Sequence, residues 1–349
     1  MKRFGFLSLT FAFAGVFATG AEPSSTSPTP DKTATATEVA EKPTKPATKA
    51  SAKVAPKVVL RAPTIADVAY GPHAKQVLHF WKAEAEKPTP LVFFIHGGGW
   101  QNGNRTSGLA PLLEPLLKAG ISVVSIEYRF IAEATADGVV PPVKGPLHDA
   151  ARALQFVRSK ADEWNLDKAR IAACGSSAGA CSSLWLAFHP DLADPKSEDP
   201  IARESTRLFC AAVIGAQTTL DPQQMKEWTP NSRYGAHAFG ISKEVDGKKV
   251  NSFDEFLAQR EKILPWIAEY SPYALVTSDD PPIYLYYRYA PGIGQPQKDP
   301  THTSNFGVKL QEHARANGLD CELVYPGATD VKYPEVQDYL IAKLKSGKP

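Results

Sequence analysis

The chain has 349 residues, of which 43% are hydrophobic, so it is long enough to bury a sizeable core. Its formal net charge of +2 arises near the start, because residues 1–58 hold 8 Lys or Arg and 4 Asp or Glu, which leaves 31 basic and 33 acidic residues in the rest. Because this body is nearly neutral, nothing in its charge points to nucleic acid as a partner. No spacing of the four cysteines resembles a metal site, and we expect them to be buried apolar residues.

The first 21 residues have the pattern of a secretory signal peptide. Two basic residues precede an apolar stretch over residues 4–17, and small residues lead up to Ala21. The stretch is shorter than the about 20 residues that span a bilayer. We therefore predict export to the periplasm, the cell envelope or the extracellular space, with no stable membrane span after the signal peptide is cleaved. Residues 22–58, rich in Pro, Thr, Ala and Lys, are predicted to be a disordered linker.

The remaining residues, 59–349, are predicted to form one domain in which strands alternate with helices. Strands are predicted at residues 77–81, 91–95, 121–126, 170–173, 208–214, 283–287 and 321–325. Helices are predicted at residues 109–117, 146–164, 178–188, 304–317 and 333–344. This alternation indicates an α/β fold with a mainly parallel sheet and helices on both faces. Residues 216–272 interrupt it with a mixture of Trp, Pro and charged residues, which indicates an insertion.

The pattern Gly175-x-Ser177-x-Gly179 lies between the predicted strand 170–173 and the predicted helix 178–188. It is typical of a nucleophile elbow, a sharp strand-to-helix turn that holds a serine in a strained conformation at the edge of the sheet. The helix N-terminus there favours developing negative charge. Ser177 is the candidate nucleophile.

A second motif, His96-Gly-Gly-Gly, directly follows the apolar run 91–95. Glycines at these positions let an acyl oxygen approach the backbone closely, and backbone N–H groups are fixed in advance as donors. We predict an oxyanion hole made by the N–H groups of Gly98, Gly99 and Ala178. His96 is expected to brace this loop and to take no part in the chemistry.

Together these motifs resemble those of α/β-hydrolase esterases of the hormone-sensitive-lipase and carboxylesterase type, close to the acetylxylan- and feruloyl-esterase-like (BD-FAE-like) group. The resemblance covers roughly residues 65–345. The matching residues are HGGGW (96–100), Glu127-Tyr128-Arg129, Leu147-His148-Asp149 and GSSAG (175–179).

The resemblance implies an α/β-hydrolase fold with a cap-like insertion after the sixth strand, which in this class often covers the active site. It also implies an exported serine hydrolase that forms an acyl-enzyme on Ser177. The expected substrates are small-molecule or carbohydrate esters, mainly short acyl esters on carbohydrates. Such chemistry needs no metal and no organic cofactor, and the sequence does not indicate an oligomeric state.

Two carboxylates are candidates for the acid of a catalytic triad. Asp280 precedes the predicted strand 283–287, whereas Asp299 follows it, and sites of this fold class gather at the carboxyl ends of strands. Asp299 also has the spacing to the next helix that the resembling esterases show, so we favour Asp299. Asp149 is expected to cap the first turn of a helix.

The histidine that should complete the triad is absent from its usual place. Resembling esterases carry it after the last strand, but residues 326–332 contain no histidine, and His313, within a predicted helix, is the last one in the chain. The base is then His302 in the loop of Asp299, or His237 in the insertion, or it is missing. A missing base would make the protein a catalytically silent binding protein of the cell envelope. A serine peptidase of the same fold is a further, weaker hypothesis.

Overall fold

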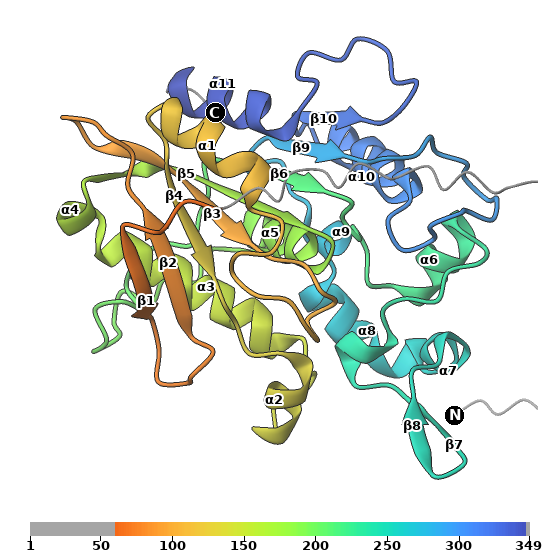
Figure 1. The fold of residues 1–349 in the computed structure, drawn as a ribbon. Helices are drawn as coiled ribbons and strands as arrows, with labels where there is room; N and C mark the ends of the chain where they lie inside the picture. The colour runs from red at the N-terminus through yellow and green to blue at the C-terminus, as the bar shows by residue number, and fades with distance from the viewer. Residues whose placement is uncertain (1–59, 347–349) are drawn as a thin grey trace, which may run out of the picture. The chain divides into compact units, whose positions relative to one another are not determined.

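The computed structural model describes residues 60–346 (Figure 1). The predicted signal peptide, residues 1–21, and the predicted linker, residues 22–58, lie outside the described residues. Within it, no helix is both long and apolar enough to cross a membrane.

An eight-stranded sheet lies at the centre of the fold, in the order β1-β2-β4-β3-β5-β6-β9-β10. β2 pairs antiparallel with both of its neighbours, and every other adjacent pair is parallel. The strands are β1 (Ile65–Ala69), β2 (Val77–Trp81), β3 (Thr89–Ile95), β4 (Ser122–Ile126), β5 (Leu166–Ser176), β6 (Cys210–Ile214), β9 (Ile283–Tyr286) and β10 (Cys321–Val324). The mainly parallel sheet confirms the predicted α/β class.

Helices cover both faces of this sheet. The helices of the described residues are α1 (Ala110–Lys118), α2 (Ile131–Ala136), α3 (Lys144–Ser159), α4 (Ala161–Trp164), α5 (Ala178–Phe188), α6 (Pro222–Trp228), α7 (Phe253–Ala258), α8 (Arg260–Tyr270), α9 (Pro272–Leu275), α10 (Ser304–Ala316) and α11 (Val336–Ser346), with the 3-10 turn η1 (Ala236–Phe239). Figure 1 shows α1 and α11 side by side, and their buried residues share one apolar cluster. Buried residues of α3, α5 and α10 belong to the cluster on the other face.

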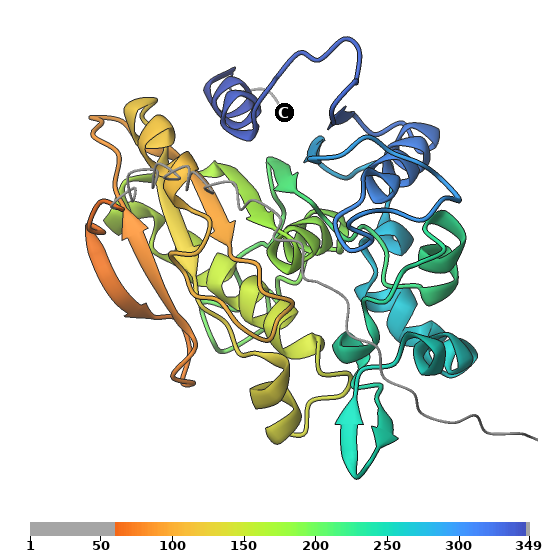
Figure 2. The same ribbon diagram turned by 45° about the vertical axis from the view of Figure 1, so that its right-hand side comes forward.

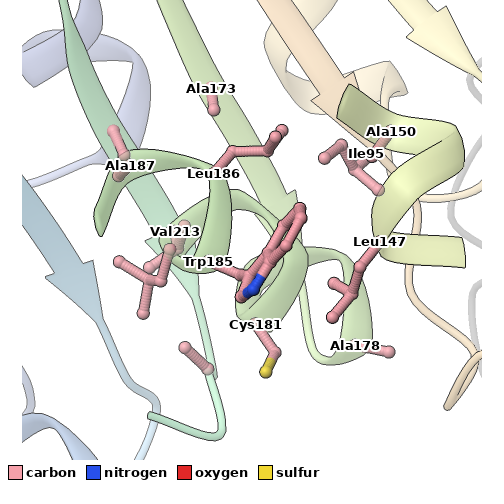
Figure 3. Packing of buried hydrophobic residues seen from close by; sticks show 14 of the residues in the cluster. Ile95, Leu147, Ala150, Ala173, Ala178, Cys181, Trp185, Leu186, Ala187 and Val213 are labelled. Carbon is pink, nitrogen blue, oxygen red and sulfur yellow. The ribbon is translucent and has the colours of Figure 1, made fainter. Parts of the chain in front are cut away.

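Alternation along the strands explains how one continuous apolar run serves both faces. In β3, Phe93 and Ile95 belong to the cluster with α3 and α5, whereas Val92 and Phe94 belong to the cluster with α1 and α11. Successive side chains of a strand point to opposite faces, so a strand covered on both sides must be apolar throughout. Figure 3 shows the first cluster around Trp185 of α5, between Leu147 and Val213. The four cysteines are free and buried, as expected.

The predicted helix over residues 146–164 is two helices, α3 and α4. The break is at Lys160, whose φ of −94° and ψ of 3° end α3. The change of direction brings the indole of Trp164 against Phe80, with ring centroids 4.6 Å apart. Burial of this aromatic pair offsets the loss of helical hydrogen bonds at the break. The break could not be predicted from the spacing of apolar residues, because the contact with Phe80 is not local in the sequence.

Residues 216–272 depart from the alternation, as predicted, and follow β6. They contain α6, η1, α7, α8 and the hairpin of β7 (Lys243–Val245) and β8 (Lys248–Val250), which projects at the lower edge of Figure 2. The segment is tied to the main fold by hydrogen bonds. The N–H of Val143 donates to the carbonyl of Ala238 at 2.9 Å, and the indole N–H of Trp185 donates to the carbonyl of Glu269 at 3.0 Å.

Candidate active site

The elbow around Ser177 connects β5 to α5 at the carboxyl end of the parallel strands. Ser177 has φ 53° and ψ −122°, a conformation that residues with a side chain rarely adopt. Its N–H donates to the carbonyl of Ile214 at 3.0 Å. A Cβ at Gly179 would lie 2.1 Å from the carbonyl oxygen of Ile95, so only glycine lets α5 begin this close to the end of β3.

Three side chains predicted from the sequence meet at this elbow. The Oγ of Ser177 lies 2.9 Å from Nε2 of His302, and Nδ1 of His302 lies 2.9 Å from Oδ2 of Asp299. Since the carboxylate can only accept, Nδ1 carries the proton, and Nε2 accepts from the serine hydroxyl. The structure therefore brings together the nucleophile, the acid and one of the two candidate bases. Their catalytic roles stay predictions.

The loop after β9 explains how acid and base can come from one short segment. Oδ1 of Asp299 accepts from the backbone N–H groups of Thr301 and His302, each at 3.2 Å, which folds the loop into a turn. Gln217 holds the turn by donating to the carbonyl of Thr301 at 2.7 Å. Gly215 lies against His302 and has φ 58°, a left-handed conformation that favours glycine; a Cβ there would make only an ordinary contact, 3.4 Å from the Cβ of His302.

The environment of Asp299 keeps its carboxylate charged. Partial burial by itself raises the pKa, but the hydrogen bond and charge of His302 and the two backbone N–H groups more than offset this. The net result is a pKa below the usual value of an aspartate. Asp299 can thus orient His302 and stabilise it when it takes up a proton.

The loop after β3 lies beside the elbow. Gly98 has φ 113° and Gly99 has φ 62°. The carbonyl of Gly98 accepts from the N–H groups of Gln101 at 3.0 Å and Asn102 at 3.2 Å, which fixes the loop in a tight turn. Ala178, the third predicted donor, is the buried first residue of α5.

His96 is completely buried and braces this loop through contacts with the backbone of the loop and with residues at the end of β4. Its Nδ1 lies 2.7 Å from the carbonyl oxygen of Gly97, and its Nε2 lies 3.2 Å from a carboxylate oxygen of Glu127. The ring also stacks on Tyr128, with centroids 4.4 Å apart. Its hydrogen bonds run within the loop and to β4's end, as expected for a bracing residue.

Two pockets open on Ser177. One, of about 270 Å³, is lined by Ser176, Ser177, Ile214, Gly215, Arg288, Tyr289, Asp299 and His302. The other, of about 440 Å³, is lined by Gly97, Gly98, Asn102, Gly103, Ser107, Gly108, Ser176, Ser177 and His302. No residue of 216–272 lines either pocket. The resemblance led us to expect that the insertion covers the active site, and in the described structure it does not cover these pockets.

The match that decides the family spans most of the main fold. The BD-FAE family model matches residues 79–288, a stretch that contains the glycine loop after β3 (residues 96–99) and the elbow of Ser177. The chain belongs to the BD-FAE family. This confirms the resemblance inferred from the two motifs, although the matched segment ends just before the loop of Asp299 and His302.

Curated relatives and solved structures agree with a BD-FAE fold. "Gut esterase 1" of Caenorhabditis elegans is 31% identical over 43% of this chain and 27% of its own length. "Probable carboxylic ester hydrolase LipM" of Mycobacterium tuberculosis is 29% identical over 42% of this chain and 32% of its own length. The chain therefore spans about a third or less of these two relatives.

Two solved structures share the α/β-hydrolase fold of this BD-FAE chain. An acetyl ester-xyloside bifunctional hydrolase from Caldicellulosiruptor lactoaceticus has a TM-score of 0.56 and 21% identity, covering 77% of this chain and 87% of its own. A truncated carbohydrate esterase from gut microbiota has a TM-score of 0.60 and 19% identity, covering 82% of this chain and 100% of its own. These likenesses confirm the predicted fold.

The other candidates in this BD-FAE chain lie elsewhere. His237, the alternative base, is buried behind the glycine loop, with a hydrogen bond to the backbone of Gly99 and no partner for its Nε2 in the described structure. Asp280 sits at the start of β9, where it accepts from the N–H of Thr277 at 2.7 Å. His313 stacks on Tyr273 within α10, with centroids 4.3 Å apart, which fits a structural residue.

The expectation for Asp149 was wrong. α3 begins at Lys144, so Asp149 lies inside the helix and does not cap its first turn. Its buried carboxylate instead accepts from the guanidinium and backbone N–H of Arg129 and from the side chain of Gln76. This pairing fixes the segment that follows β4. The sequence motif around Asp149 thus supports the fold near the site.

Arg288 and Tyr289, which line the smaller pocket, were not predicted from the sequence. Both lie shortly after β9, beyond Tyr287, at the carboxyl end of a parallel strand, where binding residues of α/β folds gather. Their position after a predicted parallel strand was therefore the signal in the sequence that could have marked them as candidate binding residues. As for metals, residues 60–346, with side chains described, contain no group of three His, Cys, Asp or Glu placed to hold an ion.

Acidification from pH 6.5 to pH 4 is expected to lower the free energy of unfolding. Burial lowers the pKa values of His148 and His237 to about 4, whereas an unfolded histidine titrates near about 6.5. Between these values the unfolded chain binds protons that the folded chain does not. The free energy of unfolding therefore decreases as the pH is lowered, by up to about 3 kcal/mol for each histidine. Urea unfolding at pH 7 and pH 5 measures this.

His237→Gln serves as the matched variant, because glutamine keeps a hydrogen-bonding side chain that does not titrate. The difference in unfolding free energy between the two pH values should be smaller in the variant than in the wild type. Equal differences would mean that burial of His237 does not contribute to the acid sensitivity.

Proposed function

We propose that this chain is an exported serine hydrolase that cleaves carboxylic esters through an acyl-enzyme on Ser177. The observation that carries the proposal is the continuous chain from the Ser177 hydroxyl through His302 to Asp299, next to the glycine loop. The names of the relatives, "Gut esterase 1" and "Probable carboxylic ester hydrolase LipM", support ester hydrolysis. Export rests on the pattern of the first 21 residues.

In this mechanism His302 takes the proton of Ser177 as the Oγ attacks the ester carbonyl carbon. The N–H groups of Gly98, Gly99 and Ala178 hold the oxyanion that forms. His302 then gives its proton to the departing alcohol oxygen, and the C–O bond breaks. A water molecule, deprotonated by His302, attacks the acyl-enzyme, and the acid leaves as Ser177 regains its proton.

Short acyl esters on carbohydrates are the proposed substrates. The side chains of His302 and Asp299 are 39% and 37% exposed, so a bulky alcohol such as a sugar can reach the serine without entering a deep tunnel. The structural neighbours named as acetyl ester-xyloside hydrolase and carbohydrate esterase support this class. The contact between His302 and Ser177 supports a hydrolase over a silent binding protein, because it puts a candidate base within hydrogen-bond reach of the serine.

Stoichiometric labelling of the full chain with a fluorophosphonate tests the proposal. We expect one probe per chain on the wild type and none on Ser177→Ala, because the probe needs an activated serine. Ser183→Ala is the matched control, since this serine of α5 donates to the carbonyl of Gly179 and does not contact His302. An unlabelled, folded wild type would overturn the hydrolase in favour of a binding protein.

A further inference from the structure

The smaller pocket on Ser177 contains a cation with no partner. Arg288 is exposed and lines this pocket together with Ser177 and His302. Within residues 60–346, as far as their side chains are described, no hydrogen bond or ion pair involves its guanidinium. Asp299, the acidic residue of the same pocket, has both oxygens occupied by the turn and by His302. The pocket therefore offers one free charge, and it is positive.

The backbone of Arg288 and its neighbour is fixed. Arg288 follows the end of β9, and the hydroxyl of Ser304, at the start of α10, donates to the carbonyl of Tyr289. Asn305, buried in the next position, accepts from the N–H of Gly292 at 2.8 Å. Because the pocket wall is held at both ends, binding of a ligand has to order only the side chain of Arg288 and not its backbone.

Tyr289 adds an aromatic surface to the same wall. Tyr289 is 41% exposed, so a ligand in the pocket can reach its ring. The ammonium of Lys298 lies 5.9 Å from the centre of this ring, so a second positive charge lies near the rim. An exposed ring beside cations suits a ring-shaped polar molecule that carries negative charge.

We propose that Arg288 binds an anionic group of the substrate, so that the preferred esters are those of acidic sugars, with a carboxylate or a sulfate near the ester bond. The proposal rests on the ester hydrolysis proposed above and adds the charge of the substrate. A guanidinium pairs with either oxyanion through two parallel N–H donors, whereas neutral sugars leave it unpaired. Arg288 is a specificity-determining residue in this scheme and takes no part in bond making.

The test compares kcat/KM for an O-acetylated methyl glucuronoside with that for the matching O-acetylated methyl glucoside, using the full chain. We expect the acidic sugar to be preferred by about tenfold at low salt, as for one charged hydrogen-bonded contact. The preference should shrink as sodium chloride is added. An O-acetylated glucoside 6-sulfate, in the same assay, assigns the anion as carboxylate or sulfate.

Three variants make the test specific. Arg288→Met should abolish the preference, and Arg288→Lys should keep part of it, because the charge stays but the planar fork is lost. Arg315→Met, which removes an exposed arginine of α10 that lines neither pocket on Ser177, should keep the preference of the wild type. Hydrolysis of acidic and neutral sugars with equal kcat/KM, or a preference retained by Arg288→Met, would overturn the anion site alone. Loss of fluorophosphonate labelling would instead overturn the proposed hydrolase.

Discussion

Replacement of His302 by glutamine is expected to lower kcat for a 4-nitrophenyl ester by about 10⁴- to 10⁶-fold, with a small change in KM. Glutamine has a similar size and can still contact the Ser177 hydroxyl, which lies 2.9 Å from Nε2 in the wild type. It cannot take up the serine proton, so the loss concerns the transition state and leaves substrate binding nearly intact. Steady-state kinetics, with circular dichroism to verify folding, measures the effect.

The matched control is His237→Gln, which makes the same change at the other histidine considered as a base. Its Nε2 is buried next to the oxyanion loop and makes no contact with Ser177 in the described structure. We expect its loss of kcat to be smaller by orders of magnitude than that of His302→Gln. The reverse order of the two variants would assign the base to His237 and contradict the triad.

The fold could be predicted because its signals are local. The apolar run of β3 must be covered on both faces, and the elbow motif requires glycines where α5 meets the end of β3, with a Cβ at Gly179 only 2.1 Å from the Ile95 oxygen. Such constraints act between neighbours in the chain or on every residue of a strand. They leave a pattern in the sequence.

The base could not be settled from the sequence because its position depends on distant residues. His302 and Ser177 are 125 positions apart, and their contact requires the turn that Asp299 makes with the backbone of Thr301 and His302. Gln217, a residue of the segment after β6, holds this turn in place. A spacing of three residues between acid and base is equally compatible with an exposed loop histidine.

The start of α3 was misjudged for a similar reason. Asp149 looks like a residue near a helix N-terminus, and its actual partner, Arg129, lies 20 positions away after β4. A buried pair of this kind is a tertiary contact, so helix-capping rules do not report it. Arg288 and Tyr289 escaped notice because neither belongs to a motif, although their place after β9 is one where ligands bind.

Replacement of Gly179 by alanine is the second change with a large expected effect. By helix propensity alone alanine would stabilise α5 by about 1 kcal/mol. The added Cβ, however, would lie 2.1 Å from the carbonyl oxygen of Ile95 and 2.5 Å from that of His96, and both are backbone atoms that cannot rotate away. We therefore expect the opposite sign, a loss of about 3 kcal/mol or more of unfolding free energy, as in overpacked cores.

The same clash should also impair turnover, because relief of it moves the end of β3 away from the elbow. The glycine loop follows β3 directly, so Gly98 and Gly99 would shift relative to Ser177. A displacement near 1 Å in a reacting geometry costs about 10²-fold in rate. Thermal unfolding and kcat of Gly179→Ala measure both effects.

Gly120→Ala separates this clash from simple backbone strain. Gly120 has φ 75°, yet a Cβ there would meet nothing within 4 Å, so its replacement carries only the strain of a left-handed conformation, about 1 to 2 kcal/mol. It should leave kcat unchanged, because Gly120 precedes β4 and lines neither pocket on Ser177. If Gly179→Ala instead kept the stability and kcat of the wild type, the close contact between β3 and α5 would not be what holds the oxyanion loop against the nucleophile.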